Sequence, residues 1–479
     1  MSLRKQTFSG LIWTFTDTFV LKGLAFIASL ILARLLGPTE FGLVGMIAVF
    51  VALGVSLVDS GLSASIIRTK DADDRDYSTV FYLNLGMSCA VYLLMYFSAP
   101  FIADFYSQPV LTDIVRLYCF SFVISAFSAV QTAMLTQKMQ FKKIAQYNIP
   151  GTIIGVVVGV SMGYMGYGVW SIVWMYLSTQ IVQSITLWAF STWKPTLTFD
   201  RERMKYHYGF GYKLMLSGIL TTSLQNLSKI VIGKFFSVQT LGFYERASTI
   251  NRYPVTVLTS IITRVTYPLL SKIQDEKERI ANVYRKLIQF TFYITAPMMI
   301  GASAIAKPLF LLVLGEQWLP AVPFFQILCL GSMLLPIHAF NLNILKVYGR
   351  SDLFLRLEVI KKIVTIISIV IGYQFGIYGL VWNGVITSLI ALMINTYYSA
   401  PLIDYSTKRQ LLDLVPTLAK SGLMYLVMWG MVILLSPYSI YYQITVPSIL
   451  GAAFYFGLSY ILKPVPFVFL VQLIKNKKF

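Results

Sequence analysis

Residues 34–43 read RLLGPTEFGL, and residues 234–243 read KFFSVQTLGF. In both stretches a cation ends a long apolar segment, two bulky apolar residues follow, and a short polar turn leads to a glycine between apolar residues. The register continues downstream, where Val55, Ser56, Ser60 and Ser63 correspond to Val255, Thr256, Ser260 and Thr263. A repeat of this kind in a membrane chain predicts two similar helical bundles, the arrangement with which many transporters move about a shared site.

The composition is typical of a membrane protein. Of the 479 residues, 57% are hydrophobic and only 12% are charged, and the mean hydropathy is +0.69. A water-soluble protein would carry far more charge on its surface. About fourteen apolar segments are long enough to cross a bilayer as helices. They lie near residues 8–33, 41–66, 78–100, 110–136, 146–164, 168–192, 210–235, 250–270, 287–314, 321–345, 357–376, 378–400, 414–436 and 440–462. The predicted fold is therefore an all-α polytopic integral membrane protein.

The lysines and arginines predict how these helices are oriented. Most of the 39 cations fall in every second loop, beginning with Arg4 and Lys5, and the intervening loops hold few. Because cytoplasmic loops are the ones enriched in lysine and arginine, both termini are predicted to be cytoplasmic. The net charge of +19 then reflects orientation and contact with anionic headgroups, so nucleic-acid binding is not expected.

The loops offer no room for an enzyme. None is long enough for a soluble catalytic domain, and the sequence has no phosphate-binding loop, HExxH motif or Cys/His cluster. Cys89, Cys119 and Cys329 lie in apolar segments without metal or disulfide spacing. No catalytic activity, cofactor or metal is therefore predicted. The acidic residues Asp71, Asp73, Asp74 and Asp76 alternate with Arg68, Lys70 and Arg75 and are interpreted as a solvated loop, and His207 is predicted to lie in a cytoplasmic loop.

Polar residues follow one face of four predicted helices. A charge near the middle of a bilayer costs at least a few kcal/mol, so each such group needs a partner, water or a function. At helical spacing the polar faces comprise Thr14, Asp17, Thr18, Lys22 and Ser29; Ser56, Asp59 and Ser63; Thr222, Gln225, Asn226 and Lys229; and Arg252, Thr256, Thr259 and Thr263, with Arg264 beside them. These are the first two helices of each predicted half.

A water-filled cavity lined by these cations would suit an anion. Lysine and arginine can hold phosphate or pyrophosphate, and amides and hydroxyls suit sugars. The predicted substrate-binding residues are Lys22, Arg34, Asn226, Lys229, Lys234, Arg252 and Arg264. Two other interpretations remain open: the hydroxyl residues also suit close helix packing, and Arg34, Lys234 and Arg252 also suit anchoring to headgroups. The predicted titrating residues are Asp17, Asp59 and His338, although His338 beside Pro336 also suits a structural histidine at a kink.

The motif LARLLGPTEFG at residues 32–42 resembles the ARxLGPxxFG hallmark of bacterial polysaccharide flippases. Further matching elements are DSGL at 59–62, IIR at 66–68, GYGVW at 166–170, LGFYERA at 241–247 and GEQW at 315–318, with GIYGLVW at 376–382 echoing residues 166–170. The chain thus resembles the Wzx-type flippases of the multidrug/oligosaccharidyl-lipid/polysaccharide (MOP) exporter superfamily.

This resemblance implies a MOP/MATE-like fold of two pseudo-symmetric lobes of six helices each. Helices 1–6 would occupy residues 1–200, helices 7–12 residues 201–403, and helices 13–14 with a basic tail residues 404–479. It implies transfer of undecaprenyl-pyrophosphate-linked oligosaccharide repeat units, as used for O-antigen lipopolysaccharide, capsule or exopolysaccharide, to the outer leaflet of the bacterial inner membrane by alternating access. A glycan polymerase and a chain-length regulator are the implied partners.

Two alternatives differ in what they require. A cation-coupled multidrug (MATE-like) exporter would share the fold, but such exporters are often described with a proline-bent first helix, and here no proline precedes Pro38. A membrane glycan polymerase or ligase would need a large outer loop for catalysis, which the sequence lacks.

Overall fold

The structure is a computed structural model that describes residues 20–59 and 61–475, without the side chains of Ile261, Arg264, Val265 and residues 473–475. Throughout these ranges the chain forms helices joined by short turns, and no strand occurs among the described residues. The predicted all-α class is confirmed. The chain divides into two compact units, Met1–Gly242 and Phe243–Phe479, which are treated separately below.

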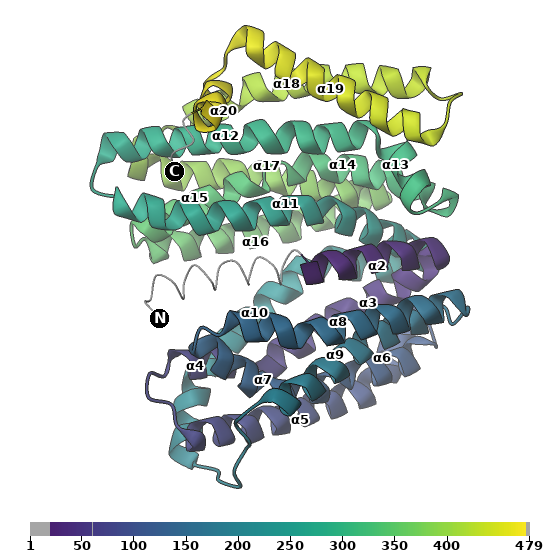
Figure 1. Cartoon of the computed structure of the whole chain (residues 1–479), viewed down its shortest axis with the longest axis vertical. Helices are drawn as coiled ribbons and strands as arrows, with labels where there is room; N and C mark the ends of the chain where they lie inside the picture. The colour runs from purple at the N-terminus through teal and green to yellow at the C-terminus, as the bar shows by residue number, and fades with distance from the viewer. Residues whose placement is uncertain (1–19, 60, 476–479) are drawn as a thin grey trace. The chain divides into compact units, whose positions relative to one another are not determined.

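The N-terminal unit contains nine complete described helices, coloured purple to teal in Figure 1. They are α2 (Lys22–Leu35), α3 (Pro38–Asp59), α4 (Leu62–Arg68), α5 (Asp74–Tyr106), α6 (Leu111–Cys119), α7 (Ser121–Gln137), α8 (Phe141–Tyr164), α9 (Trp170–Phe190) and α10 (Arg201–Phe235). Because α10 belongs to this unit, the unit extends past the lobe boundary predicted at residue 200. That boundary, drawn from the helix repeat, stays a prediction.

The C-terminal unit takes up the rest of the chain. Helix α11 (Val238–Lys272) begins in the N-terminal unit and continues into this one. The other elements are α12 (Lys277–Ala304), α13 (Ala306–Val313), the 3-10 helix η2 (Glu316–Ala321), α14 (Val322–Ser332), α15 (Leu335–Val347), α16 (Ser351–Gln374), α17 (Gly376–Ile403), α18 (Thr407–Leu434), α19 (Ile440–Leu462) and α20 (Val465–Lys475).

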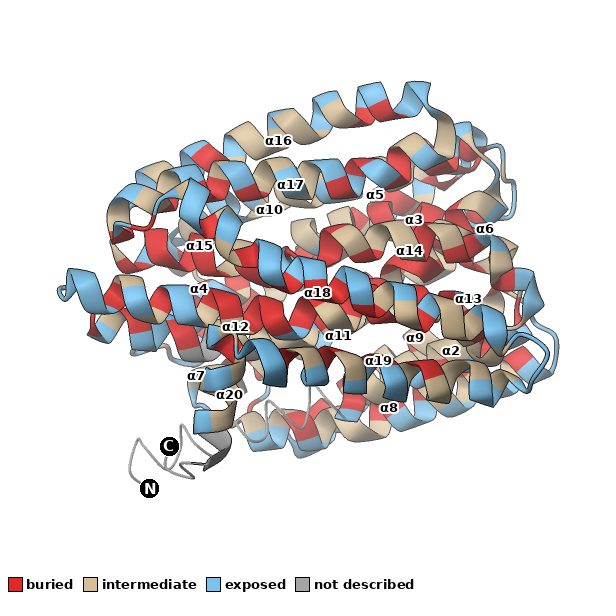
Figure 2. Ribbon diagram, turned by 90° about the horizontal axis from the view of Figure 1, so that it is seen from above, coloured by how far each residue is buried: buried red, intermediate tan, exposed pale blue. Residues whose placement is uncertain are grey.

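Nine helical stretches among the described residues are long and apolar enough to cross a membrane. They come from both units, so the chain is a multi-pass membrane protein. Apolar side chains such as Ile449 and Ile461 of α19 are more than half exposed, and that helix carries much of the pale blue in Figure 2. In a bilayer such a surface faces lipid. The predicted number of about fourteen spans remains a prediction.

The sequence repeat builds the same local structure twice. Helix α2 ends at Leu35 and α3 begins at Pro38, while α10 ends at Phe235 and α11 begins at Val238. In the first turn the carboxylate of Glu40 accepts the backbone N–H of Gly37 at 2.9 Å. In the second turn the hydroxyl of Ser237 accepts the backbone N–H of Thr240 at 3.2 Å. Each copy therefore uses one half of the reciprocal capping box that starts many helices.

The two copies cross each other at their glycines. A β-carbon built on Gly42 would lie 2.0 Å from the carbonyl oxygen of Val238, and one built on Gly242 would lie 1.9 Å from that of Pro38. All four residues belong to the N-terminal unit. The contact is reciprocal, because the position of each glycine in one copy meets the position four residues earlier in the other. Only glycine permits the two backbones to approach this closely.

Helices α8 and α9 form an antiparallel pair beside α2 (Figure 1), joined by a turn that contains two glycines. Gly166 and Gly168 in this turn have φ of 80° and 54°, a backbone conformation that favours glycine. Along α8 a stripe of glycines lets α9 approach, and a β-carbon on Gly155 would lie 1.9 Å from the hydroxyl of Thr179. This pairing fixes the positions of α8 and α9, whose residues line two hollows of the N-terminal unit.

The C-terminal tail contains a helix that the sequence analysis missed. Within the region predicted as a basic tail, Val465–Lys475 form α20, which packs on α12. The rings of Phe290 and Phe469 lie 5.5 Å apart, edge to face. The apolar run that forms α20 is too short to span a bilayer, so a search for spanning segments does not reveal it. A helix of this length can still pack against neighbouring helices.

Candidate functional site

The predicted cationic residues are divided between the two units. Lys22 and Arg34 lie on α2, Asn226, Lys229 and Lys234 lie on α10, and Arg252 lies on α11 in the C-terminal unit. The side chains of Lys22, Arg34, Lys234 and Arg252 are exposed, whereas those of Asn226 and Lys229 are partly buried. Asp17 and the side chain of Arg264 lie outside the described residues. Whether these groups share one cavity stays a prediction.

Lys22 borders a largely apolar hollow within the N-terminal unit. The hollow has a volume of about 280 Å³ and lies between α2, α8 and α9. Its polar lining consists of Lys22, Asn148, Thr152, Tyr176, Thr179 and Gln183. One cation with several uncharged hydrogen-bonding groups can accommodate an anion that carries hydroxyls.

Two of the predicted polar faces meet. The hydroxyls of Ser56 on α3 and Thr222 on α10 lie 3.2 Å apart. One turn further along α10, the amide of Asn226 donates to the backbone carbonyl of Thr222 at 2.9 Å. These contacts agree with the interpretation in which hydroxyl residues hold helices together. They also place Asn226 and Lys229 on a helix whose polar face packs against α3.

Asp59 ends α3 with an exposed side chain. It borders a second hollow of about 290 Å³ in the N-terminal unit, whose other polar lining comes from Ser63, Asn84, Ser125, Thr132 and Thr136. The rest of the lining is apolar, so the carboxylate lies at the edge of a largely apolar hollow. Its predicted role in coupling stays a prediction.

His338 is held on both sides by helix α17. Its Nε2 lies 3.0 Å from the hydroxyl of Ser388, and its Nδ1 lies 3.3 Å from the amide nitrogen of Asn395. Both ring nitrogens thus have partners within the C-terminal unit. The geometry favours the structural histidine over a titrating group.

Lys234 binds to the end of another helix of its own unit. Its ammonium group donates to the backbone carbonyl of Phe105, at the end of α5, and lies 4.7 Å from the centre of that phenyl ring. A cation over an aromatic face gains favourable electrostatic energy. Lys234 therefore links α10 to α5, whatever it contributes to substrate binding.

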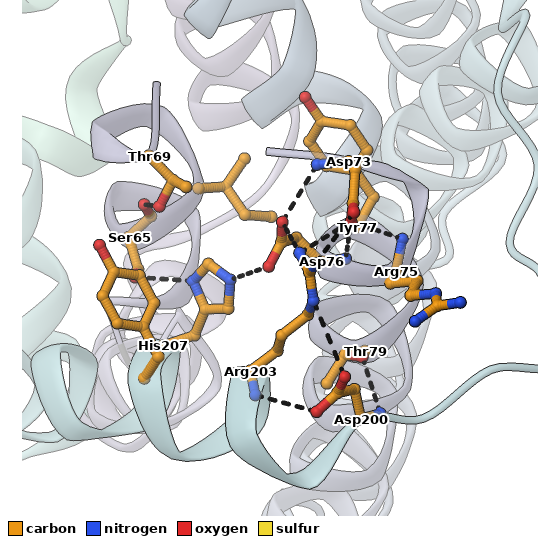
Figure 3. Close-up of polar contacts among 12 residues, drawn as sticks. Ser65, Thr69, Asp73, Arg75, Asp76, Tyr77, Thr79, Asp200, Arg203 and His207 are labelled. Carbon is orange, nitrogen blue, oxygen red and sulfur yellow. Dashed lines mark hydrogen bonds and ion pairs between the residues drawn. The ribbon is translucent and has the colours of Figure 1, made fainter. Parts of the chain in front are cut away.

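A polar cluster that the sequence analysis missed joins α4, α5 and α10 (Figure 3). The buried carboxylate of Asp76 accepts from Arg203, from His207 Nε2 at 3.1 Å and from the backbone N–H of Asp73 at 3.0 Å. Arg203 also pairs with Asp73 at 2.8 Å. The hydrogen bond and charge of Asp76 raise the pKa of Arg203 above its usual value. The cluster ties the start of α10 to the start of α5.

The prediction of a solvated loop was wrong for Asp76 and for His207, whereas Asp73 is exposed. Asp76 is 4% exposed and His207 is 0% exposed, and His207 lies within α10 rather than in a loop. Asp73 caps α5, forming a capping box with Asp76. The spacing Asp73-x-x-Asp76 before an apolar run could have indicated this helix start from the sequence.

Ser65, His207 and Asp76 form a chain of hydrogen bonds in the order of a hydrolase triad. The Ser65 hydroxyl lies 2.8 Å from His207 Nδ1. The side chains of Ser65 and His207 have no exposed surface, so no substrate reaches the hydroxyl. A nucleophile must contact its substrate, and the chain of hydrogen bonds is therefore a structural connection between three helices.

Lys420 is a second charged residue that the sequence analysis did not single out. It is 5% exposed in the core of the C-terminal unit, within α18. Its ammonium group lies 4.9 Å and 5.3 Å from the ring centres of Tyr293 and Tyr455, and 3.4 Å from the hydroxyl of Ser459. The two aromatic faces compensate for part of the water that the ammonium loses on burial. Its partners lie on α12 and α19, so only the folded core reveals its environment.

Comparisons with known proteins agree with this architecture. The lipopolysaccharide biosynthesis protein WzxC of Escherichia coli (strain K12) is 26% identical over 441 residues, which cover 90% of each chain. The solved structure of the lipid II flippase MurJ in an inward closed conformation superimposes with a TM-score of 0.77 at 14% identity, covering 94% of this chain and 98% of that one. An inward-facing multidrug resistance transporter of the MATE family, within the MOP superfamily, gives a TM-score of 0.60 at 17% identity, covering 83% and 99%.

The two structural likenesses establish a MOP-like polytopic membrane fold. The family model described as "Polysaccharide biosynthesis protein" matches residues 31–323, more than half of the chain. This range includes both copies of the repeat and the polar cluster around Asp76. The chain belongs to this family of polysaccharide biosynthesis proteins.

Proposed function

We propose that this protein is a flippase for undecaprenyl-pyrophosphate-linked oligosaccharide repeat units. It moves them from the cytoplasmic to the outer leaflet of the bacterial inner membrane by alternating access, and it is not an enzyme. The observation that carries the proposal is the pairing of a polysaccharide biosynthesis family match with the fold of a lipid II flippase over nearly the whole chain. The finer topology follows the loop charges, with both termini in the cytoplasm.

Lys22 and Lys229 are the proposed contacts to the pyrophosphate. Lys22 borders a hollow with hydroxyl and amide groups in its wall, and Lys229 lies on the α10 face that includes Asn226. Ammonium groups form strong charge-assisted hydrogen bonds to phosphate oxygens. Arg34 would act at the other end of α2 from Lys22, and Lys234 would act beyond Lys229 at the end of α10. Arg252 and Arg264 would contribute from the C-terminal unit. Asp17 and Asp59 are the proposed proton-coupling residues. A glycan polymerase and a chain-length regulator are the proposed partners.

The second candidate is a cation-coupled multidrug exporter. The fold of such an exporter superimposes less closely than that of the flippase, with TM-scores of 0.60 and 0.77. In addition, α2 contains no proline over its described length, Lys22–Leu35. Both observations favour the flippase.

Lys22→Ala and Lys229→Ala test the substrate assignment. Each is expected to reduce surface polysaccharide at least tenfold when it replaces the native protein in its host, because the pyrophosphate loses a charged donor. Lipid-linked repeat units should accumulate, and lipid extraction with mass spectrometry measures them. Surface glycan is quantified on the same cells.

Lys213→Ala is the matched control, since Lys213 is an exposed lysine of the same helix as Lys229. It should leave surface glycan unchanged, and all variants should reach the membrane in equal amounts. Normal glycan in both lysine variants together with reduced drug tolerance would contradict the flippase and favour the exporter. The variants Lys22→Arg and Lys229→Arg keep the positive charge. They should therefore produce more surface glycan than the corresponding alanine variants.

A further inference from the structure

A small pocket lies where three helices of the N-terminal unit end. It has a volume of about 110 Å³ and lies between the end of α7, the start of α8 and the end of α9. The residues that matter here are Gln131, Lys138, Lys143, Tyr147, Phe190 and Trp193. Both α7 and α8 belong to apolar stretches able to cross a membrane, so their shared end lies at a membrane boundary. The pocket is separate from the hollow beside Lys22.

Two buried side chains in the wall of this pocket lack hydrogen-bond partners among the described residues. Gln131 is 2% exposed, and neither its amide nitrogen nor its amide oxygen is paired. Trp193 is 7% exposed, and its indole N–H is also unpaired. Folded proteins pair nearly all buried polar atoms, so two unpaired groups in one pocket point to a polar ligand that completes them.

The other polar groups of the pocket attract an anion. Lys138 follows α7, Lys143 lies in the first turn of α8, and both are exposed. The first turn of α8 also starts without a side-chain cap, and it forms the positive end of that helix. No aspartate or glutamate lies among the residues that line the pocket. An indole N–H, an amide, two ammonium groups and a helix N-terminus together suit a phosphate group.

Aromatic side chains beside the pocket indicate that the phosphate is attached to a lipid. The rings of Tyr147 and Phe190 stack 5.5 Å apart, nearly parallel at 6°. Phe190 is 64% exposed although it is fully apolar, as expected for a ring in contact with lipid at the headgroup level. Leu187 and Met134 complete an apolar wall. A free phosphate in water would use only the polar half of this surface.

We propose that this pocket binds the phosphate group of an anionic lipid at the membrane boundary, apart from the proposed substrate path. The lysines attract the charge, Trp193 and Gln131 donate to the phosphate oxygens, and the Tyr147–Phe190 stack contacts the glycerol or the chain next to it. The phosphate can come from a phospholipid or from a polyprenyl phosphate, and both offer the same chemistry to these groups. Binding here does not depend on the proposed transport activity.

The test uses the full-length purified protein in detergent, with native mass spectrometry and thermal-shift titration. The probes are phosphatidylglycerol, undecaprenyl phosphate, phosphatidylcholine and inorganic phosphate. Saturable binding of either anionic lipid at least tenfold tighter than that of phosphatidylcholine supports the site, and the tighter of the two identifies the source. Equal binding of all the lipids would overturn the proposed lipid site. So would inorganic phosphate that stabilises the protein as much as the anionic lipids do.

Three variants assign the binding to this pocket. Lys138→Ala combined with Lys143→Ala should weaken anionic-lipid binding at least tenfold, and Trp193→Phe, which removes the indole N–H together with one of the two fused rings, about fivefold. Gln131→Leu should weaken binding while leaving the unfolding temperature of lipid-free protein equal or higher, because it removes unpaired polar atoms. Lys205→Ala, at an exposed lysine of α10, is the control. Unchanged binding in the lysine and tryptophan variants would refute the assignment, even if the protein binds anionic lipids elsewhere.

Discussion

Gly42→Ala is expected to remove most of the folded protein from the membrane. The new β-carbon would lie 2.0 Å from the carbonyl oxygen of Val238 and 2.8 Å from its carbonyl carbon. Both atoms belong to the backbone of α11, so no side-chain rotation relieves the overlap. Overpacking of this kind typically lowers the free energy of unfolding by about 1–3 kcal/mol. Because the clash here is with backbone, which cannot rotate away, we expect a loss of about 3 kcal/mol or more.

The measurement is the thermal unfolding midpoint of purified protein, together with the amount of monodisperse protein extracted from membranes. Gly86→Ala on α5 is the matched control, because a β-carbon there meets nothing within 4 Å. In a helix that substitution should be neutral or stabilise by up to about 1 kcal/mol. A Gly42→Ala protein that unfolds at the same temperature as Gly86→Ala would disprove the close crossing.

The partner glycine sharpens the test. Gly242→Ala alone should be as damaging as Gly42→Ala, since its β-carbon would lie 1.9 Å from the carbonyl oxygen of Pro38. The double variant should lose clearly less stability than the two single losses added together, because separating the helices once relieves both overlaps. Such non-additivity is typical of residues that share one contact. Additive losses would mean that the two glycines act at independent places.

Asp76→Ala carries the second large expected effect, a loss of about 2–3 kcal/mol in the free energy of unfolding. Removing one partner of a buried ion pair usually costs about 3–5 kcal/mol, and the smaller figure allows for the side chain of Arg203 being 32% exposed. His207 also loses the acceptor at 3.1 Å and has no water in reach, as its side chain is fully buried. Denaturation of the purified protein measures the loss.

Asp71→Ala provides the control, since Asp71 is an exposed acid of the same sequence cluster. Its effect should stay within about 0.5 kcal/mol, as for most exposed charges. The double variant with Arg203→Met should lose less than the sum of the single changes, with a coupling of at least about 1 kcal/mol. Equal effects of Asp71→Ala and Asp76→Ala would support the solvated loop that the sequence suggested.

The sequence predicted the class of fold because that information is local. Apolar segments of sufficient length and scarce charge require membrane helices, and the shared turn before Gly42 and Gly242 predicted a structural repeat. The hydrogen bonds at Gly37 and Ser237 confirm that the two turns start their helices alike, although they use different side chains.

The polar cluster could not be predicted in the same way. Arg203 and His207 lie far along the chain from Asp76, and between them the polypeptide forms α5 through α9. In the sequence around Asp76, acidic residues alternate with basic residues, a pattern typical of a solvated loop. Burial of Asp76 becomes visible only when α10 packs against α5. The pocket around Gln131 is hidden for a similar reason, because Trp193 arrives from a loop beyond α9.

The candidate substrate residues could be predicted only in part. Helical spacing placed Ser56 and Thr222 on polar helix faces, but it did not indicate that these two residues lie 3.2 Å apart. It could not reveal that Lys234 already binds the carbonyl of Phe105, since that contact depends on where α5 ends. For His338 the sequence leaves a titrating and a structural role open, and the contacts of both ring nitrogens with α17 agree with the structural role.

The crossing of α3 and α11 gives the weak internal repeat a structural meaning. Between RLLGPTEFGL and KFFSVQTLGF, one position alone is identical, the glycine at 42 and 242. The other nine positions differ, while the position whose side chain would strike the opposite backbone is glycine in both copies. Because the two glycines share one contact, a change at either one is expected to disrupt the crossing. Within these ten positions, the one identity marks the place where the two copies touch.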